Sequence, residues 1–191
     1  LHGPGGSGKT YCLTEVVLKV VRHFCGEGGV KAIAATNGGA RLLRGEAMHK
    51  AGKMTREQSF KARHLKPTAR ARKALETGWQ DPVLLAADEI SMAKPPLFAG
   101  IHRHAFYGRA RHLRLRPNEI MEHPFGDVLL QVLMGDFLQL NPVASHTLLE
   151  ALCKPHVPGV PPKTTDEDRD GYQLFRNACK NVILFSGTHR F

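Results

Sequence analysis

The chain has 191 residues, of which 42% are hydrophobic, so one globular domain is expected and general disorder is excluded. Lys and Arg number 27 against 17 Asp and Glu, and the net charge of +10 favours a polyanionic partner. The four cysteines form no CxxC pair and no apolar run reaches the ~20 residues of a membrane span. The sequence therefore predicts a soluble, intracellular protein without a zinc ribbon or a disulfide framework.

A glycine-rich segment near the start of the chain matches the pattern G-x-x-x-x-G-K-[ST] at every fixed position. Its residues are Gly3, Pro4, Gly5, Gly6, Ser7, Gly8, Lys9 and Thr10. Backbone N–H groups that converge on phosphate oxygens need positive φ and close approach, which glycine permits. We expect Lys9 to contact the β and γ phosphates of ATP and Thr10 to bind Mg²⁺. The competing interpretation is a glycine-rich turn that matches the pattern by chance.

Only Leu1 and His2 precede this loop. A phosphate loop normally follows a buried strand, so we expect that strand to be missing and the chain to be truncated there.

Four short apolar runs are predicted to form buried strands, since each is too short for a helix and too continuous for a half-exposed strand. They cover residues 30–36, 83–87, 128–134 and 182–185. Helical spacing lies between them, over residues 14–24 and 97–106. This alternation predicts an α/β fold with a mostly parallel sheet flanked by helices.

Two segments, 50–73 and 103–116, are dense in Lys and Arg and lack a motif of their own. A solvated face explains each of them as well as a functional surface does. His102, His104 and His112 lack cysteine or acidic companions at ligand spacing, so no zinc site is predicted there. Residues 154–171, rich in Pro and charge, are predicted to form a surface loop between the third and fourth strands.

The second predicted strand ends in two acids, Asp88 and Glu89. Carboxylates at this edge of a parallel sheet lie beside the metal of a bound nucleotide. We expect Asp88 to hold Mg²⁺ and Glu89 to be the general base that activates the attacking water. The alternative is a plain helix N-terminus, where the helix dipole favours acidic residues.

Two of these segments resemble motifs of the petite-integration-frequency (PIF) DNA helicases. Residues 88–92, DEISM, are similar to the D-E-x-S-M motif, and residues 135–143, GDFLQLNPV, are similar to G-D-x-x-Q-L-P-P-V. The second pattern is long and therefore specific. The family belongs to superfamily one, together with RecD and the helicase part of conjugative relaxases.

Two further stretches resemble the family more loosely. Residues 35–49 are similar to its first DNA-contacting motif, although Asn37, Gly39 and Ala47 replace the usual Gly, Ala and Thr. Residues 188–191, THRF, are similar to the fourth motif, with Phe191 in place of Gln.

The resemblance implies that residues 1–191 are the first RecA-like ATPase domain of an ATP-dependent DNA helicase, truncated at both ends. A second RecA-like domain would follow in cis and supply an arginine finger. The resemblance assigns Gln139 to the γ phosphate and the lytic water, and Arg190 to the γ phosphate. It assigns contacts with single-stranded DNA to Thr36, His49 and Lys50.

At the level of the whole protein, the resemblance implies 5′ to 3′ translocation, unwinding of duplexes and DNA junctions, and roles in DNA repair, recombination and telomere maintenance. The expected location is the nucleus or mitochondrion of a eukaryote, or otherwise the cytoplasm. Two alternatives remain open. The chain could be a nucleotide-binding, DNA-associated module without unwinding activity, either degenerate or derived from a mobile element. It could also be another P-loop enzyme such as a small-molecule kinase, although the 135–140 motif argues against a kinase.

Overall fold

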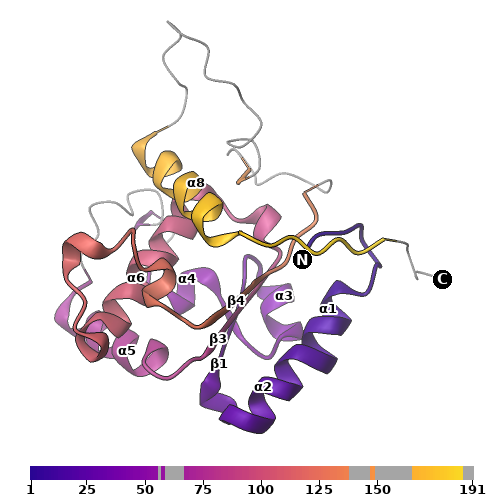
Figure 1. Ribbon diagram of the computed structural model, residues 1–191. Helices are drawn as coiled ribbons and strands as arrows, with labels where there is room; N and C mark the ends of the chain where they lie inside the picture. Colours follow the sequence, from indigo (N-terminus) through magenta and orange to yellow (C-terminus); the bar gives the residue numbers. More distant parts are fainter. Residues whose placement is uncertain (56, 59–66, 138–146, 149–164, 187–191) are drawn as a thin grey trace, which may run out of the picture.

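The computed structural model describes residues 1–55, 57–58, 67–137, 147–148 and 165–186. Four parallel strands in the order β2-β1-β3-β4 form the central sheet (Figure 1). The strands are β1 (Val30–Ala34), β2 (Glu46–Ala47), β3 (Leu84–Asp88) and β4 (Leu130–Leu133). Every residue of β3 is buried, because this strand has neighbours on both sides and helices on both faces. The predicted α/β fold with a parallel sheet is confirmed.

One face of the sheet is covered by the helical segment after the phosphate loop and by α3 (Asn37–Leu42). The segment runs from α1 (Lys9–Tyr11) through a π-helical turn (Cys12–Val17) into α2 (Leu18–Cys25). The helix predicted over residues 14–24 is therefore confirmed, and it begins earlier than expected. Its apolar residues pack on alternate strand positions in one core cluster. The buried members are Leu13, Leu18, Ala32, Ala34, Ala40, Leu43, Leu84, Ala86 and Met134.

Among the described residues, the opposite face is covered by α4 (Met48–Ala51), α5 (Ala69–Trp79), α6 (Pro95–Leu113) and α8 (Asp166–Ala178). The strand residues that face them, Ile33, Leu85 and Ala87, alternate with those that face α1 and α2, as the pleat of a strand requires. Trp79 is fully buried, and its indole N–H donates to the Ala51 carbonyl at 3.2 Å. Short 3₁₀ turns occur at Glu27–Gly29, Ile90–Met92, Pro117–Glu119 and Pro124–Gly126.

Two histidines in or directly before the second basic segment are core residues. His102 and His104 are buried in α6, and the His102 Nδ1 accepts a hydrogen bond from the Phe125 N–H at 2.9 Å. Burial lowers the pKa of His102 to about 3 and also lowers the pKa of His104. Within the described ranges, no group of three His, Cys, Asp or Glu side chains could hold a metal ion. No helix of those ranges is long and apolar enough to cross a membrane.

The structure contradicts two predictions about the end of the chain. The loop predicted over residues 154–171 includes residues 166–171, which instead begin α8. Thr165 and Asp168 form a reciprocal capping box there, and it starts the helix. Residues 154–164 lie outside the described part.

The strand predicted over residues 182–185 is also wrong, because a single residue, Leu184, makes an isolated parallel bridge with His2. An apolar run forms a strand only where a neighbouring strand of similar length pairs with its backbone. The other three predicted strands are present, with ends that differ by at most two residues.

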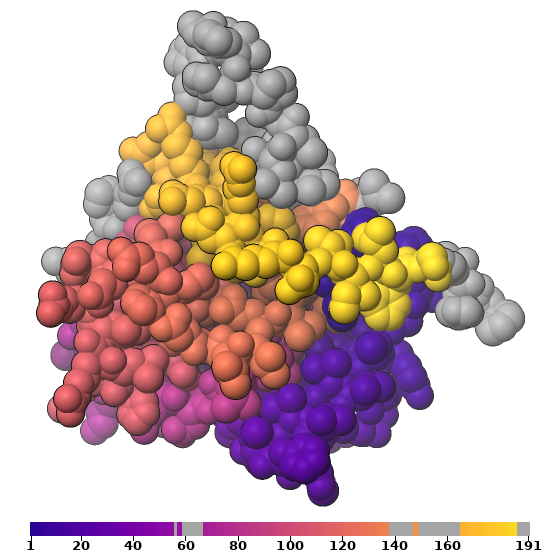
Figure 2. Space-filling model, in the orientation of Figure 1, coloured from indigo at the N-terminus to yellow at the C-terminus, as the bar shows by residue number. Residues whose placement is uncertain are grey.

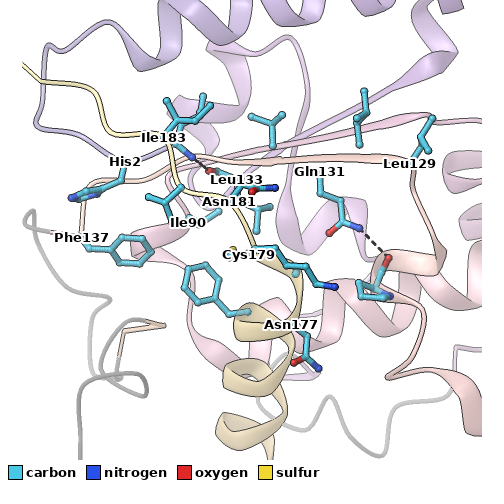
Figure 3. A pocket seen from close by; sticks show the side chains of 18 residues that line it. His2, Ile90, Leu129, Gln131, Leu133, Phe137, Asn177, Cys179, Asn181 and Ile183 are labelled. Atoms are coloured by element: carbon cyan, nitrogen blue, oxygen red, sulfur yellow. Dashed lines mark hydrogen bonds between the residues drawn. The ribbon is translucent and has the colours of Figure 1, made fainter.

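A groove of about 540 Å³ lies along the free edge of β4, with residues 177–183 on its other side (Figure 3). The segment that follows α8, yellow in Figure 2, runs over the surface to the indigo N-terminal residues. The amino group of Leu1 donates to the Leu133 carbonyl at 2.6 Å. His2 forms isolated parallel β-bridges with Gly135 on one side and with Leu184 on the other. The first two residues therefore occupy a strand position beside β4.

Candidate nucleotide-binding site

The phosphate loop, residues 3–10, connects His2 at the carboxyl edge of the sheet to α1. Gly6 and Gly8 have φ values of 79° and 86°, a left-handed conformation that glycine adopts without strain. Gly3 is required by packing, because a Cβ there would lie 2.6 Å from the Phe185 carbonyl oxygen. The loop ends at the first turn of α1, whose free backbone N–H groups and dipole favour an anion.

Lys9 folds back over the loop that precedes it. Its ammonium donates to the carbonyls of Gly3 and Pro4, at 2.8 Å for Pro4, and lies 3.4 Å from the Ser7 hydroxyl. A phosphate oxygen carries charge and accepts a stronger hydrogen bond than a neutral carbonyl does. The ammonium can therefore exchange these partners for the phosphates of a nucleotide.

Asp88 ends β3 beside the first turn of α1. Thr10 donates its hydroxyl to Asp88 Oδ2 at 3.2 Å, and the Glu89 N–H donates to Oδ1 at 2.7 Å. The side chain is 6% exposed, and burial raises the pKa of Asp88 although the two hydrogen bonds oppose that shift. A buried carboxylate beside a hydroxyl is a site where a cation would relieve the cost of burying the charge.

Glu89 has a backbone φ of 55°, which is uncommon for a residue with a side chain. Thr36 donates its hydroxyl to Glu89 Oε2 and accepts the Gly39 N–H at 3.1 Å, which caps α3. A Cβ at Gly39 would lie 2.6 Å from the same carboxylate oxygen. Glycine in place of the family's alanine therefore leaves room for the Glu89 side chain.

The three residues assigned to DNA take different positions. Thr36 contacts the candidate base Glu89, as described above. His49 and Lys50 lie on α4, where His49 is partly buried and Lys50 is exposed. Their DNA contacts stay a prediction.

The beginning of the 135–143 segment, GDFLQLNPV, lies at the same edge of the sheet. Gly135 and Asp136 line the cleft above the phosphate loop, and the backbone N–H of the buried Asp136 donates to the Ser91 hydroxyl oxygen at 3.3 Å. Gln139 and Arg190 lie outside the described residues, so their assigned roles stay predictions.

These groups surround a cleft of about 420 Å³. The described residues that line it are Gly5, Gly6, Ser7, Gly8, Lys9, Thr10, Tyr11, Leu42, Asp88, Glu89, Ser91, Met92, Gly135 and Asp136. Thr10 and Asp88 present one hydroxyl and one carboxylate to it, a set that fits Mg²⁺, which usually takes one or two protein oxygens plus phosphate and water. The residues present therefore fit a Mg²⁺-bound nucleoside triphosphate.

Several contributors to the site were not predicted as site residues, among them Tyr11, Gly39 and Ser91. Ser91 stands inside the DEISM motif, so the motif contained a signal for it. Gly39 stands inside the segment that resembles a DNA-contacting motif, but its closeness to Glu89 depends on the fold, and no local pattern indicates Tyr11.

The parallel sheet, the phosphate loop and the acids at its edge define the class of P-loop α/β domains. A family model described as PIF1-like helicase matches residues 1–154. The chain belongs to this PIF1-like helicase family.

Several individual proteins are similar to this chain. The ATP-dependent DNA helicase PIF6 of Trypanosoma brucei brucei is 33% identical over 147 residues, which is 76% of this chain and 16% of that protein. The crystal structure of Pif1 helicase from Candida albicans matches with a TM-score of 0.61 at 21% identity, covering 98% of this chain and 35% of that one. Pif1 from Bacteroides in complex with ADP-AlF3 and ssDNA matches with a TM-score of 0.49 at 25% identity, covering 75% and 29%. The chain thus spans about a sixth of the curated relative.

Proposed function

We propose that this domain is the ATP-hydrolysing part of a DNA helicase, and that it couples the state of its nucleotide to movement along single-stranded DNA. The observation that carries the proposal is a chain of direct contacts across the carboxyl edge of the sheet. Thr10 contacts Asp88, the backbone of Glu89 contacts Asp88, and the Glu89 carboxylate contacts Thr36. The phosphate loop is thus connected to the segment that resembles a DNA-contacting motif.

The chemistry follows from the positions of these groups. Bound Mg²⁺ would neutralise phosphate charge, held by Thr10 and Asp88. Lys9 would bind the β and γ phosphates, and Glu89 would accept a proton from the attacking water. Since the Glu89 carboxylate is bonded to Thr36, a movement of α3 changes the position of the base. DNA bound near α3 would in this way control hydrolysis.

The finer functions rest on family membership. They are 5′ to 3′ translocation, unwinding of DNA junctions, and service in DNA repair, recombination and telomere maintenance. Completion of the ATP site by Gln139, Arg190 and a second RecA-like domain belongs to the same proposal. The proposal also includes the location of the protein, which is the nucleus or mitochondrion in a eukaryote and otherwise the cytoplasm.

A substitution of the base tests the proposal in a chain extended by a second RecA-like domain. Glu89→Gln keeps the size of the side chain and its ability to accept the Thr36 hydroxyl, so nucleotide binding should persist. DNA-stimulated ATP hydrolysis should fall by roughly 10²-fold or more, the scale of losing a general base. Titration with a fluorescent ATP analogue and a phosphate-release assay measure the two quantities.

Glu27→Gln is the matched control, because Glu27 is an exposed carboxylate whose partner is Arg22 rather than the site. Lys9→Ala should abolish most nucleotide binding. Hydrolysis by Glu89→Gln at the parent rate would show that another group activates the water. Binding and hydrolysis without any strand separation would favour a nucleotide-binding module that does not unwind DNA.

A further inference from the structure

The fold brings the two basic segments of the sequence together. Helices α5 and α6 pack side by side (Figure 1), and the Arg72 guanidinium lies 5.5 Å from the centre of the Tyr107 ring. Exposed basic residues stand on α5 and around the end of α6. They form what we call the α5–α6 basic surface, which comprises Arg70, Arg72, Lys73, Arg111, His112 and Arg114.

Little negative charge opposes this surface. A hollow of about 460 Å³ between the helices is lined by Arg111, His112 and Arg114 on the α6 side and by Glu76 and Gln80 on the α5 side. Glu76 is the one acidic residue among those that line it. Within the described ranges, no lysine or arginine of the surface makes an ion pair with a carboxylate. Unpaired guanidinium groups at this density favour an anionic partner over a purely solvated face.

The surface is remote from the nucleotide cleft. Met92 lines that cleft, and α6 begins at Pro95 and extends for 19 residues, or about 28 Å, before Arg114. Near its end, Arg109 donates to the Pro82 carbonyl at 3.1 Å, just before β3 begins. The basic surface therefore lies toward the amino edge of the sheet, and the nucleotide cleft lies at the carboxyl edge.

We propose that the α5–α6 basic surface binds the phosphate backbone of duplex DNA. Guanidinium groups recognise phosphates without reading sequence. Proteins that hold single strands add aromatic rings on which bases stack, whereas the Tyr107 ring is covered here by Arg72. A duplex presents phosphates and needs no stacking. The proposal goes beyond the ATP-driven function, because this contact needs no nucleotide.

Charge neutralisation at exposed positions tests it in the chain as it stands. The test variant carries Arg70→Gln, Lys73→Gln and Arg111→Gln, and it leaves the Arg72–Tyr107 contact in place. The control variant also loses three exposed basic residues, two on α8 and one just after it. It carries Arg169→Gln, Arg176→Gln and Lys180→Gln. Fluorescence anisotropy measures binding to a blunt DNA duplex of about two helical turns, between about 50 and 200 mM salt. Circular dichroism verifies that both variants are folded.

We expect the test variant to bind the duplex at least about tenfold more weakly. Its salt slope should fall by up to about 2.7, or about 0.9 for each of three lost phosphate contacts. The control variant should keep the parent slope. Glu76→Gln should strengthen duplex binding by about two- to threefold, since it removes the opposing charge, and this increase cannot arise from misfolding.

Other outcomes overturn the proposal. Equal losses in the test and control variants would show that net charge alone attracts DNA. If the test variant lost equal affinity for duplex and single-stranded DNA, or lost affinity for an RNA duplex alone, the ligand of the surface would be a different one. Lys9→Ala should bind the duplex as the parent does, so failure of the nucleotide site and failure of this surface are distinguishable.

Discussion

At the scale of the residue, Asp88 shows how a functional group acts against stability. Its carboxylate is buried, and burial is the largest cause of its raised pKa. A carboxyl whose folded pKa lies above the unfolded value favours folding at low pH, and this contribution is lost as the pH rises through the folded pKa. At neutral pH the ionised Asp88 therefore destabilises the nucleotide-free domain.

Asp88→Asn should accordingly raise the melting temperature at neutral pH, by about 2–4 °C for each kcal/mol gained. The amide can still accept the Thr10 hydroxyl, while the charge that would hold Mg²⁺ is lost. The Mg²⁺-dependent part of nucleotide affinity should disappear. Thermal melts and ATP-analogue titrations with and without Mg²⁺ give both quantities, and Asp81→Asn at an exposed position is the control. A lower melting temperature would mean that Asp88 stabilises the fold.

At the scale of the element, α6 determines how the core responds to acid. This helix contributes the buried His102, whose pKa of about 3 lies far below the ordinary value of 6.5. A lowered folded pKa means that the unfolded chain binds the proton more tightly, so stability falls as the pH drops from about 6.5 toward 3. Between these values, one such group costs up to about 1.4 kcal/mol per pH unit.

His102→Gln should flatten this dependence, because glutamine can accept the Phe125 N–H and does not titrate. We expect a lower free energy of unfolding at pH 7, owing to imperfect packing, and a smaller further loss below pH 6. Urea unfolding at several pH values between 4 and 7 measures this slope. His112→Gln, at an exposed position of the same helix, should behave as the parent. If the His102 and His112 variants show the same slope, the acid sensitivity has another source.

At the scale of the whole molecule, apolar side chains are exposed along the free edge of β4. The exposed fractions of Leu129, Leu130, Val182 and Ile183 are 80%, 51%, 69% and 59%. These side chains line the groove (Figure 3). In it, Leu1 and His2 pair with residues 133–135 on one side and with Leu184 on the other. Within the described residues, β4 has no neighbouring strand along this groove. The groove therefore offers a position where a further strand can pair with β4.

Filling that position should stabilise the domain. A chain that carries a short segment of β-branched residues before Leu1 should melt several degrees higher than one that carries a Gly/Ser segment of the same length. The reason is that the strand buries apolar area at about 25 cal/mol per Å² and supplies backbone hydrogen bonds. Hydrogen exchange should show protection of the Gln131 amide in the first chain alone, since its N–H points to the free edge whereas the Leu130 N–H already donates to Val83. Equal melting temperatures would show that the groove does not take a strand.

The sequence by itself determined the α/β class, three of the strands, the phosphate loop and the pair Asp88 and Glu89. These features depend on local composition and short spacing, because a buried parallel strand is apolar along its length and a phosphate loop needs glycine at fixed positions. Tertiary structure decided the rest. It shows the bond from Thr36 to Glu89, the core role of His102 and the meeting of the two basic segments on α5 and α6. It also shows that residues 182–185 do not form a strand. Each of these findings depends on contacts between residues that lie far apart in the sequence. Such contacts leave no local pattern in the chain.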